Sequence, residues 1–465
     1  MAIIDASSGQ NGVSCVWYSP LEKQQFMRYI YLVFCLLITL QLSAQSWQIT
    51  PKALVPERVS NNAVVEGFVN GVPHVYTFGG IDSTKLYSGI HLRSYRYNTQ
   101  TDVWDTLPPL PDTLGKIAAG ASRVQDKLYI IGGYHVFANG GEASSDKVHI
   151  FDPASNSYLP DGAPIPVPID DQVQAVWRDS LIYVVTGWSN TANVPNVQIY
   201  NPSANTWQVG TSVPNDNIFK SFGASGAIIG DTIYYFGGAS MAGSFNIQLY
   251  FRRGIIDPNN PTQITWVNFT WGGQRGYRMA ATTAYNKVIW LGGSNKTYNY
   301  NGRAYDGTGG VPPLGRSLWF DRSNNTFKAE FGYDFPMDLR GLGDINDTLK
   351  YTVGGMEANQ LVSRKTLRLA LEPDSVTFVN TPILANPIPL ALVLSPTPTK
   401  DYLRVELEQD LPWSYQVTNL AGIRLKMGKE TVRTASLDLR TLVAGVYILE
   451  VQQGKYTGQR LIQME

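Results

Sequence analysis

The chain has 465 residues, enough for more than one domain, and its 37 basic residues (Lys and Arg) are balanced by 37 acidic ones (Asp and Glu). This balance gives no support to nucleic-acid binding, which normally needs a basic face. The two cysteines, Cys15 and Cys35, lie near the N-terminus, so the rest of the chain has neither a disulfide bond nor a thiolate for a metal.

Residues 27–45 have the pattern of a secretory signal peptide. Arg28 provides a basic start, an apolar core follows, and Ser43 and Ala44 precede Gln45. The core is short for a membrane span, although an N-terminal anchor is the alternative. We therefore expect residues 1–44 to be an N-terminal extension and signal peptide, with Met27 as the true start. The mature protein should be secreted or lie at the outer cell surface, without an integral membrane span.

A repeat follows, in which an apolar and aromatic run ends in a pair of small turn residues. The period is roughly 50–60 residues, a length typical of repeat architectures. Short apolar stretches separated by Gly, Pro and Asn turns predict one four-stranded antiparallel sheet in each period. The glycines suit a bend with positive φ or a close approach between neighbouring sheets. The six pairs are Gly79-Gly80, Gly132-Gly133, Thr186-Gly187, Gly237-Gly238, Gly292-Gly293 and Gly354-Gly355.

Each period also has an Asx-Pro-type turn and a spaced aromatic residue that opens its last strand. The first five periods place these aromatics at Trp104, Tyr158, Trp207, Trp266 and Phe327. The pattern over residues 47–372 resembles the kelch repeat, and departs from it at Thr186, Tyr158 and Phe327. The resemblance implies a β-propeller, whose radial blades leave only short, protected edges. We expect an all-β fold with a six-bladed kelch β-propeller over residues 45–372.

The two ends of the repeat array predict how the ring closes. After Gly355 there is one clear strand, Thr366–Leu371, and no aromatic fourth strand follows it. Upstream of the first copy, Trp47-Gln48-Ile49 has the missing pattern. We therefore expect this N-terminal strand to complete the last blade.

The C-terminal part has a different composition. Residues 373–393 are rich in Pro, Asn and Val and predict a linker. Residues 394–465 contain alternating strands with Gly turns, which predict a small Ig-like β-sandwich. The order Pro396-x-Pro398, then Asn419-x-x-Gly422, then Leu439-x-x-Leu442-x-x-Gly445-x-Tyr447 resembles the sorting domain of the type IX secretion system of Bacteroidetes. That resemblance implies the secretion machinery as a partner and later removal of the domain. An adhesive or spacer module is the alternative.

One end of the ring should carry the binding residues. In an antiparallel blade alternate loops share a face, so the loops entering each blade lie beside the loops that follow the Gly pairs. Arginine offers planar bidentate donors and aromatic faces accept sugar rings, so these residues suit an anionic or carbohydrate ligand. Ordinary solvated loop residues are the alternative. The candidate ligand-binding residues are Arg58, Lys116, Tyr134, Trp188, Lys220, Arg275, Arg278, Arg340 and Glu357.

Two kinds of kelch enzyme show which residues catalysis would require of this chain. Copper-radical galactose oxidases need a cysteine, which this chain lacks after residue 35, and its four histidines show no metal-ligand spacing. A sialic-acid mutarotase type would need an arginine and an acid/base, roles open to Arg275 or Arg278 and Glu357. We expect no metal, no cofactor and no assigned catalytic residue. The main hypothesis is a binding protein for a glycan or protein partner; a sugar-modifying enzyme and a structural spacer are the alternatives.

Overall fold

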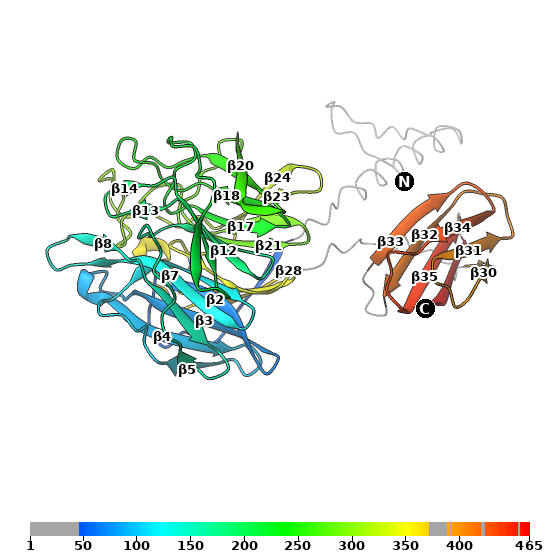
Figure 1. Cartoon of the computed structure of the whole chain (residues 1–465), viewed down its shortest axis with the longest axis horizontal. Helices are drawn as coiled ribbons and strands as arrows, with labels where there is room; N and C mark the ends of the chain where they lie inside the picture. The colour runs from blue at the N-terminus through cyan, green and yellow to red at the C-terminus, as the bar shows by residue number, and fades with distance from the viewer. Residues whose placement is uncertain (1–45, 372–387, 391, 420–423, 454–455) are drawn as a thin grey trace, which may run out of the picture. The chain divides into compact units, whose positions relative to one another are not determined.

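A computed structural model describes residues 46–371, 388–390, 392–419, 424–453 and 456–465. The chain divides into two compact units, Met1–Asp374 and Ser375–Glu465. The described residues form β-strands and two single turns of 3-10 helix, η1 (Tyr87–Gly89) and η2 (Ala358–Gln360), as Figure 1 shows. The expected signal peptide lies outside the described residues, as does most of the expected linker. Among the described residues, no helix is long and apolar enough to cross a membrane.

The described part of the first unit contains six larger sheets, and in each of them four main strands pair in antiparallel fashion, largely in chain order. The first sheet holds β2 (Ala63–Val69), β3 (Val72–Ile81), β4 (Ile90–Asn98) and β5 (Val103–Leu107). The second holds β6 (Ile117–Val124), β7 (Lys127–Val136), β9 (Val148–Asp152) and β10 (Ser157–Tyr158), with β8 (Glu142–Ser144) added beside β7. The third holds β11 (Val173–Trp177), β12 (Leu181–Val185), β15 (Val197–Asn201) and β16 (Thr206–Val209).

The remaining three sheets follow the same order. The fourth holds β17 (Ser225–Ile229), β18 (Thr232–Phe236), β19 (Tyr250–Asp257) and β20 (Asn260–Thr270). The fifth holds β21 (Ala280–Ala284), β22 (Lys287–Leu291), β23 (Arg316–Asp321) and β24 (Thr326–Phe331). The sixth holds β26 (Gly343–Asn346), β27 (Leu349–Val353), β28 (Thr366–Leu371) and β1 (Trp47–Pro51). Three short pieces, β13 (Trp188–Ser189), β14 (Ala192–Asn193) and β25 (Arg340–Gly341), lie outside this pattern.

The sixth sheet takes its outer strand from the N-terminus, where the sequence placed it. Trp47 of β1 pairs with Leu371 of β28. The Trp47 side chain is buried and stacks on Trp319 of the fifth sheet, with ring centroids 5.5 Å apart. The two ends of the repeat array therefore meet within one sheet.

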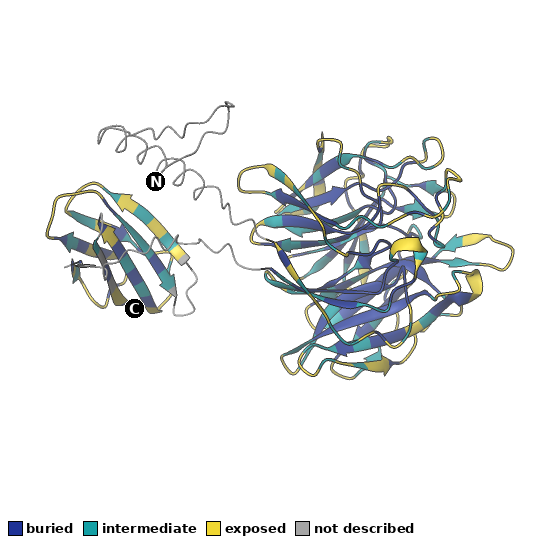
Figure 2. Ribbon diagram, turned by 180° about the vertical axis from the view of Figure 1, so that it is seen from behind, coloured by how far each residue is buried: buried dark blue, intermediate teal, exposed yellow. Residues whose placement is uncertain are grey.

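Backbone hydrogen bonds connect the first strands of all six sheets into a circle. One residue at or shortly before the start of each first strand has positive φ, and these residues are Asn61, Ala118, Asp171, Gly223, Arg278 and Asp338. The backbone N–H of each of these residues donates to the carbonyl of the corresponding residue in the preceding sheet, at 2.8–3.3 Å. In the sixth sheet the donor is Leu339 in place of Asp338, and the N–H of Asn61 closes the circle by donating to the carbonyl of Asp338. The second strands are more deeply buried than the first: four of the five residues of β18 are buried, whereas all five of β17 are intermediate. Figure 2 shows that buried residues run through the strands and that exposed ones lie mostly in loops. Six such sheets in a closed ring fit the expected propeller.

The glycine pairs hold neighbouring sheets close together, as the sequence predicted. The first glycine of each Gly-Gly pair has positive φ, and a methyl group at Gly237 would clash with the carbonyl oxygen of Gly276 in the next sheet. The exception, Thr186, also has positive φ. Its hydroxyl donates to the carbonyl of Ser221 at 3.2 Å and accepts from the Ser221 N–H at 2.9 Å. A side-chain hydrogen bond thus replaces the close backbone approach.

Replacing Gly237 by alanine should therefore lower the free energy of unfolding by about 2 kcal/mol more than the same change at Gly71. Both glycines have positive φ, but a methyl group at Gly71 would meet nothing within 4 Å. Gly71→Ala thus measures the cost of the conformation alone, and the difference between the variants measures the close approach. Urea unfolding of both variants checks the prediction, and equal losses would contradict it.

The second unit contains two sheets around one hydrophobic core. One has the order β29 (Ile388–Pro389), β36 (Tyr456–Met464), β35 (Gly445–Gln453), β32 (Trp413–Asn419) and β33 (Arg424–Glu430). The other has the order β30 (Leu392–Ser395), β31 (Tyr402–Leu407) and β34 (Thr434–Asp438). Leu403 and Val405 of the smaller sheet share a buried cluster with Val417 and Leu449 of the larger one. The arrangement fits the expected small β-sandwich.

Candidate functional site

A small cavity of about 120 Å³ lies at the end of the ring where the first strands begin. We call this end the mouth and the cavity the mouth pocket. The loops that follow the glycine pairs emerge at the same end, and the short strands β8, β13 and β14 belong to them (Figure 1). The mouth pocket is lined by Tyr134, Glu142, Asp170, Asp171, Trp188, Phe222, Phe245, Arg278, Asn299 and Tyr305.

The lining side chains come from loops of the second to the fifth sheets. Asp170, Asp171, Phe222 and Arg278 stand just before first strands, where the circle of hydrogen bonds fixes the backbone. The others lie at or beyond the ends of second strands. Tyr305 belongs to the loop of the longest repeat period, and this loop is tied to its neighbour by the Thr297 hydroxyl, which donates to the Phe245 carbonyl at 2.7 Å.

Four aromatic rings pack against one another in the mouth pocket. The Trp188 ring lies 5.4 Å from Phe222 and 5.6 Å from Phe245, measured between centroids. The Phe245 ring lies 4.7 Å from that of Tyr305. These contacts are edge-to-face, the arrangement that ring quadrupoles favour. Trp188 is half-buried, so part of its surface remains for a ligand.

A buried network of charges includes two residues of the pocket lining, Arg278 and Asp171. Arg278 is 1 % exposed, and its guanidinium donates to both carboxylate oxygens of Asp171 at 3.1 and 2.6 Å and to Asp338 at 3.1 Å. Burial alone would lower the pKa of Arg278, but Asp171, Tyr277 and Asp338 outweigh it and hold the pKa well above its usual value. Arg278 is therefore a permanent cation that two carboxylates already neutralise.

Two further groups complete this network. The Ser60 hydroxyl donates to the second oxygen of Asp338 at 2.7 Å. Arg340 is buried, lies 3.4 Å from Asp171 and donates to the carbonyl of Gln172 at 3.0 Å. Two of the four arginines expected to bind an anionic or carbohydrate ligand, Arg278 and Arg340, are thus engaged inside the protein. This placement differs from the arginine-lined mouth that the sequence predicted, because the side chains turn toward carboxylates of neighbouring sheets.

Asp170 and Glu142 are the acidic groups of the mouth pocket that this network leaves out. Asp170 is 4 % exposed and accepts one hydrogen bond, from the Ser144 hydroxyl at 2.5 Å. Burial, followed by the charge of Asp171, raises its pKa well above the usual value. Partial burial is the main cause that raises the pKa of Glu142, and the charge of Asp171 adds to it. Glu142 lies on β8 and is itself partly open to solvent.

Three of the nine predicted residues, Tyr134, Trp188 and Arg278, line the mouth pocket, and Arg340 lies beside it. The others are used or placed elsewhere. Arg58 donates to the carbonyl of Val362 at 2.8 Å, and Glu357 accepts from the Ser363 hydroxyl and pairs with Lys365. Among the described residues, Lys220 and Arg275 do not line the mouth pocket, and Arg275 is exposed.

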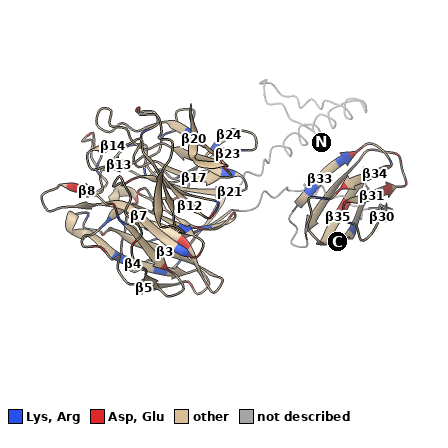
Figure 3. Cartoon of the chain, viewed as in Figure 1, with Lys and Arg blue, Asp and Glu red and all other residues tan. Residues whose placement is uncertain are grey.

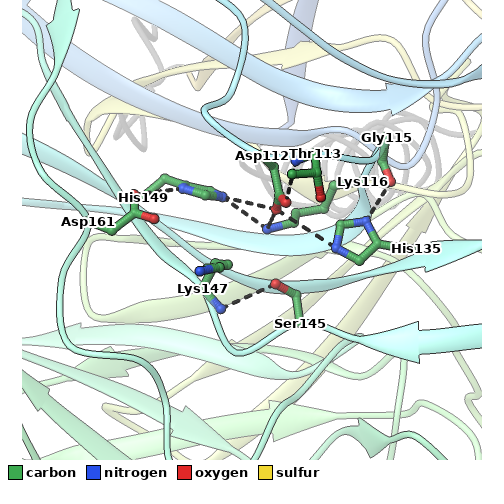
Figure 4. A network of polar contacts seen from close by, with 9 residues as sticks. All are labelled: Asp112, Thr113, Gly115, Lys116, His135, Ser145, Lys147, His149 and Asp161. Atoms are coloured by element: carbon green, nitrogen blue, oxygen red, sulfur yellow. Dashed lines mark hydrogen bonds and ion pairs between the residues drawn. The ribbon is translucent and has the colours of Figure 1, made fainter.

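Lys116 lies inside the protein, away from the mouth pocket, in the network drawn in Figure 4. Its ammonium is 2.7 Å from Asp112 and 3.0 Å from Nε2 of His149, whose Nδ1 lies 2.9 Å from Asp161. Burial lowers the pKa of Lys116, and Asp112 opposes that effect. Lys116 is therefore not available to a ligand at the mouth. Within the described residues, no group of three or more His, Cys, Asp or Glu side chains could hold a metal ion.

Sequence reasoning missed several residues of the mouth pocket, notably Glu142, Phe222 and Phe245. The sequence does contain a repeated feature that could have identified Phe222. In several repeats an apolar residue directly precedes the residue with positive φ, as in Phe222-Gly223, Tyr277-Arg278 and Met337-Asp338. For Glu142 and Phe245, which lie in loops of irregular length, we find no such signal.

A second and larger cavity, of about 490 Å³, runs along the first strands. Small residues and backbone form much of its wall, and its charged groups already have partners. Glu66 lies 3.2 Å from Arg123 and accepts from the backbone N–H of Asp344. In the view of Figure 3, charges of both signs are scattered over the strands. The mouth pocket, with its aromatic rings and unpaired carboxylates, is the better candidate site.

Comparison with known proteins supports both units. Residues 394–464 match the family described as "Secretion system C-terminal sorting domain". Kelch-like protein 35 of Mus musculus is 26 % identical over 142 residues, which is 30 % of this chain and 22 % of that protein. Kelch-like protein terF of Aspergillus terreus is 31 % identical over 140 residues, 29 % of each protein. The chain thus spans less than a third of the length of these curated relatives.

The solved structure of YjhT is also similar. It matches 69 % of this chain and 99 % of its own with a TM-score of 0.55 and 15 % sequence identity, which shows a likeness of fold alone. With the kelch-like relatives, it confirms a kelch-type propeller. The match at the C-terminus confirms a type IX sorting domain, which indicates export to the cell surface or the outside of the cell.

Proposed function

We propose that this chain is a secreted or cell-surface binding protein that uses the mouth pocket of a six-bladed kelch propeller to bind a glycan or protein partner. The propeller comprises residues 45–372, and the Ig-like domain at residues 394–465 serves as a removable sorting signal. The secretion machinery would recognise that domain. The propeller would then meet its partner outside the cell.

The observation that carries this proposal is the composition of the mouth pocket. Aromatic rings and carboxylates from four sheets converge on one cavity, which is the combination of apolar lining and few polar groups that ligand sites share. Its volume of about 120 Å³ is well below the roughly 300 Å³ at which sites for whole small molecules begin. The pocket therefore suits one projecting group of a larger partner, such as a side chain or a sugar substituent.

A sugar-modifying enzyme of the mutarotase type is the second candidate, and Asp170 is the observation that favours it. Burial, followed by the charge of Asp171, raises the pKa of Asp170 well above its usual value, which is the direction that a general acid needs. Such an enzyme also needs an arginine that binds the carboxylate of the sugar. Arg278 is a poor candidate for this role, because it already binds Asp171 and Asp338. A structural spacer, the third alternative, would need no pocket.

Trp188→Ala should weaken partner binding by about thirtyfold, equivalent to the loss of a typical interface hot spot. The mature chain would be screened against glycan arrays and extracted surface proteins, and affinities would then be measured for the partner found. Arg275→Ala, at the mouth but outside the pocket, is the control and should bind normally. Unchanged binding by Trp188→Ala, with its thermal unfolding unaltered, would exclude the mouth pocket. Turnover lost in Asp170→Asn while binding is retained would indicate the enzyme.

A further inference from the structure

We propose that the mouth pocket recognises an ammonium group, held between the free carboxylates of Asp170 and Glu142 and the aromatic rings of Trp188, Phe245 and Tyr305. The inference rests on the proposed function and names the chemical group that the partner presents. It also replaces the anionic ligand that the sequence suggested with a cationic one.

The first argument is the charge around the pocket. Arg278 is the one cationic side chain among the described residues that line it. Its guanidinium is shared between Asp171 and Asp338, and Arg340 adds a second contact to Asp171. These two arginines and two aspartates neutralise one another, which leaves the carboxylates of Asp170 and Glu142 without a cation.

The second argument is that Asp170 has an unused oxygen. Ser144 donates to one carboxylate oxygen, and within the described residues the other takes no hydrogen bond. A carboxylate oxygen that loses water without gaining a donor is costly, and an ion, a water or a ligand is one explanation for such a group in a native structure. Because Asp170 lines the cavity, a donor placed there would satisfy this oxygen.

The third argument is the shape and chemistry of the walls. Aromatic faces attract cations through the ring quadrupole, and groups of several rings are the usual way in which proteins bind substituted ammonium ions. Trp188, Phe245 and Tyr305 form such a group and line the same pocket as the carboxylates. An anion would lie against Asp170 and Glu142 with no free guanidinium to hold it. An ammonium group gains charge-assisted hydrogen bonds and the ring faces together.

An ammonium group could come from a lysine side chain of a protein or from an amino sugar of a glycan. Two pairs of probes separate these sources, and in each pair acetylation replaces the charged ammonium group by a neutral and larger amide. The first pair is N-acetyl-lysine amide and its Nε-acetylated form, and the second is glucosamine and N-acetylglucosamine. Binding of each probe to the full mature chain would be followed by calorimetry and by ligand-observed NMR.

We expect the charged member of at least one pair to bind at least tenfold more tightly than its acetylated counterpart. Asp170→Asn and Glu142→Gln should each weaken the charged probe by about tenfold. Asp334→Asn, which changes a carboxylate 85 % exposed elsewhere on the propeller, should have no effect. Equal binding within both pairs, or no binding of either charged probe, would overturn the inference. Charge-independent binding that Trp188→Ala abolishes would overturn it while leaving the proposed function intact.

Discussion

Replacing Arg278 with methionine should lower the free energy of unfolding by about 3–5 kcal/mol, the usual cost of removing one partner from a buried ion pair. Methionine fills much of the same space, so the loss comes mainly from charge. Asp171 is 2 % and Asp338 0 % exposed, and both would be left without the guanidinium that compensates them. Urea unfolding at neutral pH measures the change, and a loss below about 1 kcal/mol would contradict the prediction.

The control is Arg275→Met, because Arg275 lies three residues away and its side chain is exposed. This change should alter stability by less than about 0.5 kcal/mol. Acid should also reduce the deficit of Arg278→Met. Burial already raises the pKa of Asp338, and without Arg278 the hydrogen bond from Ser60 would be left to lower it. A raised folded pKa gives stability at low pH that is lost as pH rises, so the difference from the native protein should shrink toward pH 4.

The buried charges need not make the protein more stable than an apolar centre would. Replacing a whole buried ion cluster by neutral groups is often harmless. The triple variant Arg278→Met, Asp171→Asn, Asp338→Asn should therefore recover much of the stability that Arg278→Met loses. If it does, the network serves to fix the orientation of the mouth loops, since each of its three residues also belongs to the circle of backbone hydrogen bonds or its closure.

The architecture could be predicted because it depends on local and repeated features. Each glycine pair marks a bend where a side chain would meet the backbone of the next sheet, and such a bend recurs with the period. Thr186 shows the limit of this reasoning. Its hydroxyl bonds to Ser221, a contact that replaces glycine but has no local signature.

The site was harder to predict because it depends on pairs of residues far apart in the chain. Arg278 binds Asp171, 107 residues earlier, and Asp338, 60 residues later. The sequence places all three at the mouth but does not show that they neutralise one another. Arginines and aromatic residues at the end of a ring therefore predicted an anionic or carbohydrate ligand, whereas the pairing of Arg278 leaves Asp170 and Glu142 without a cation. Lys116 was likewise expected at the surface and is instead buried beside Asp112.

Trp47→Ala should lower the free energy of unfolding by about 3–5 kcal/mol, the range typical of removing a buried tryptophan. Trp47 is 5 % exposed and packs on Trp319, in a core cluster that joins the fifth and sixth sheets. Its indole N–H has no hydrogen-bond partner in the described structure, so the loss comes from packing alone. Chemical unfolding followed by tryptophan fluorescence and by circular dichroism measures it.

The matched control is Gln48→Ala, on the same strand but with an exposed side chain, which should change stability by less than about 0.5 kcal/mol. If Trp47→Ala loses the predicted free energy of unfolding and Gln48→Ala does not, the N-terminal strand β1 holds the ring closed through its buried face. Because the first strands are joined in a circle, opening one sheet should weaken the others, and both optical signals should shift together. An early transition confined to one signal would instead mean that β1 detaches while the remaining sheets stay folded, and the ring would not depend on this closure.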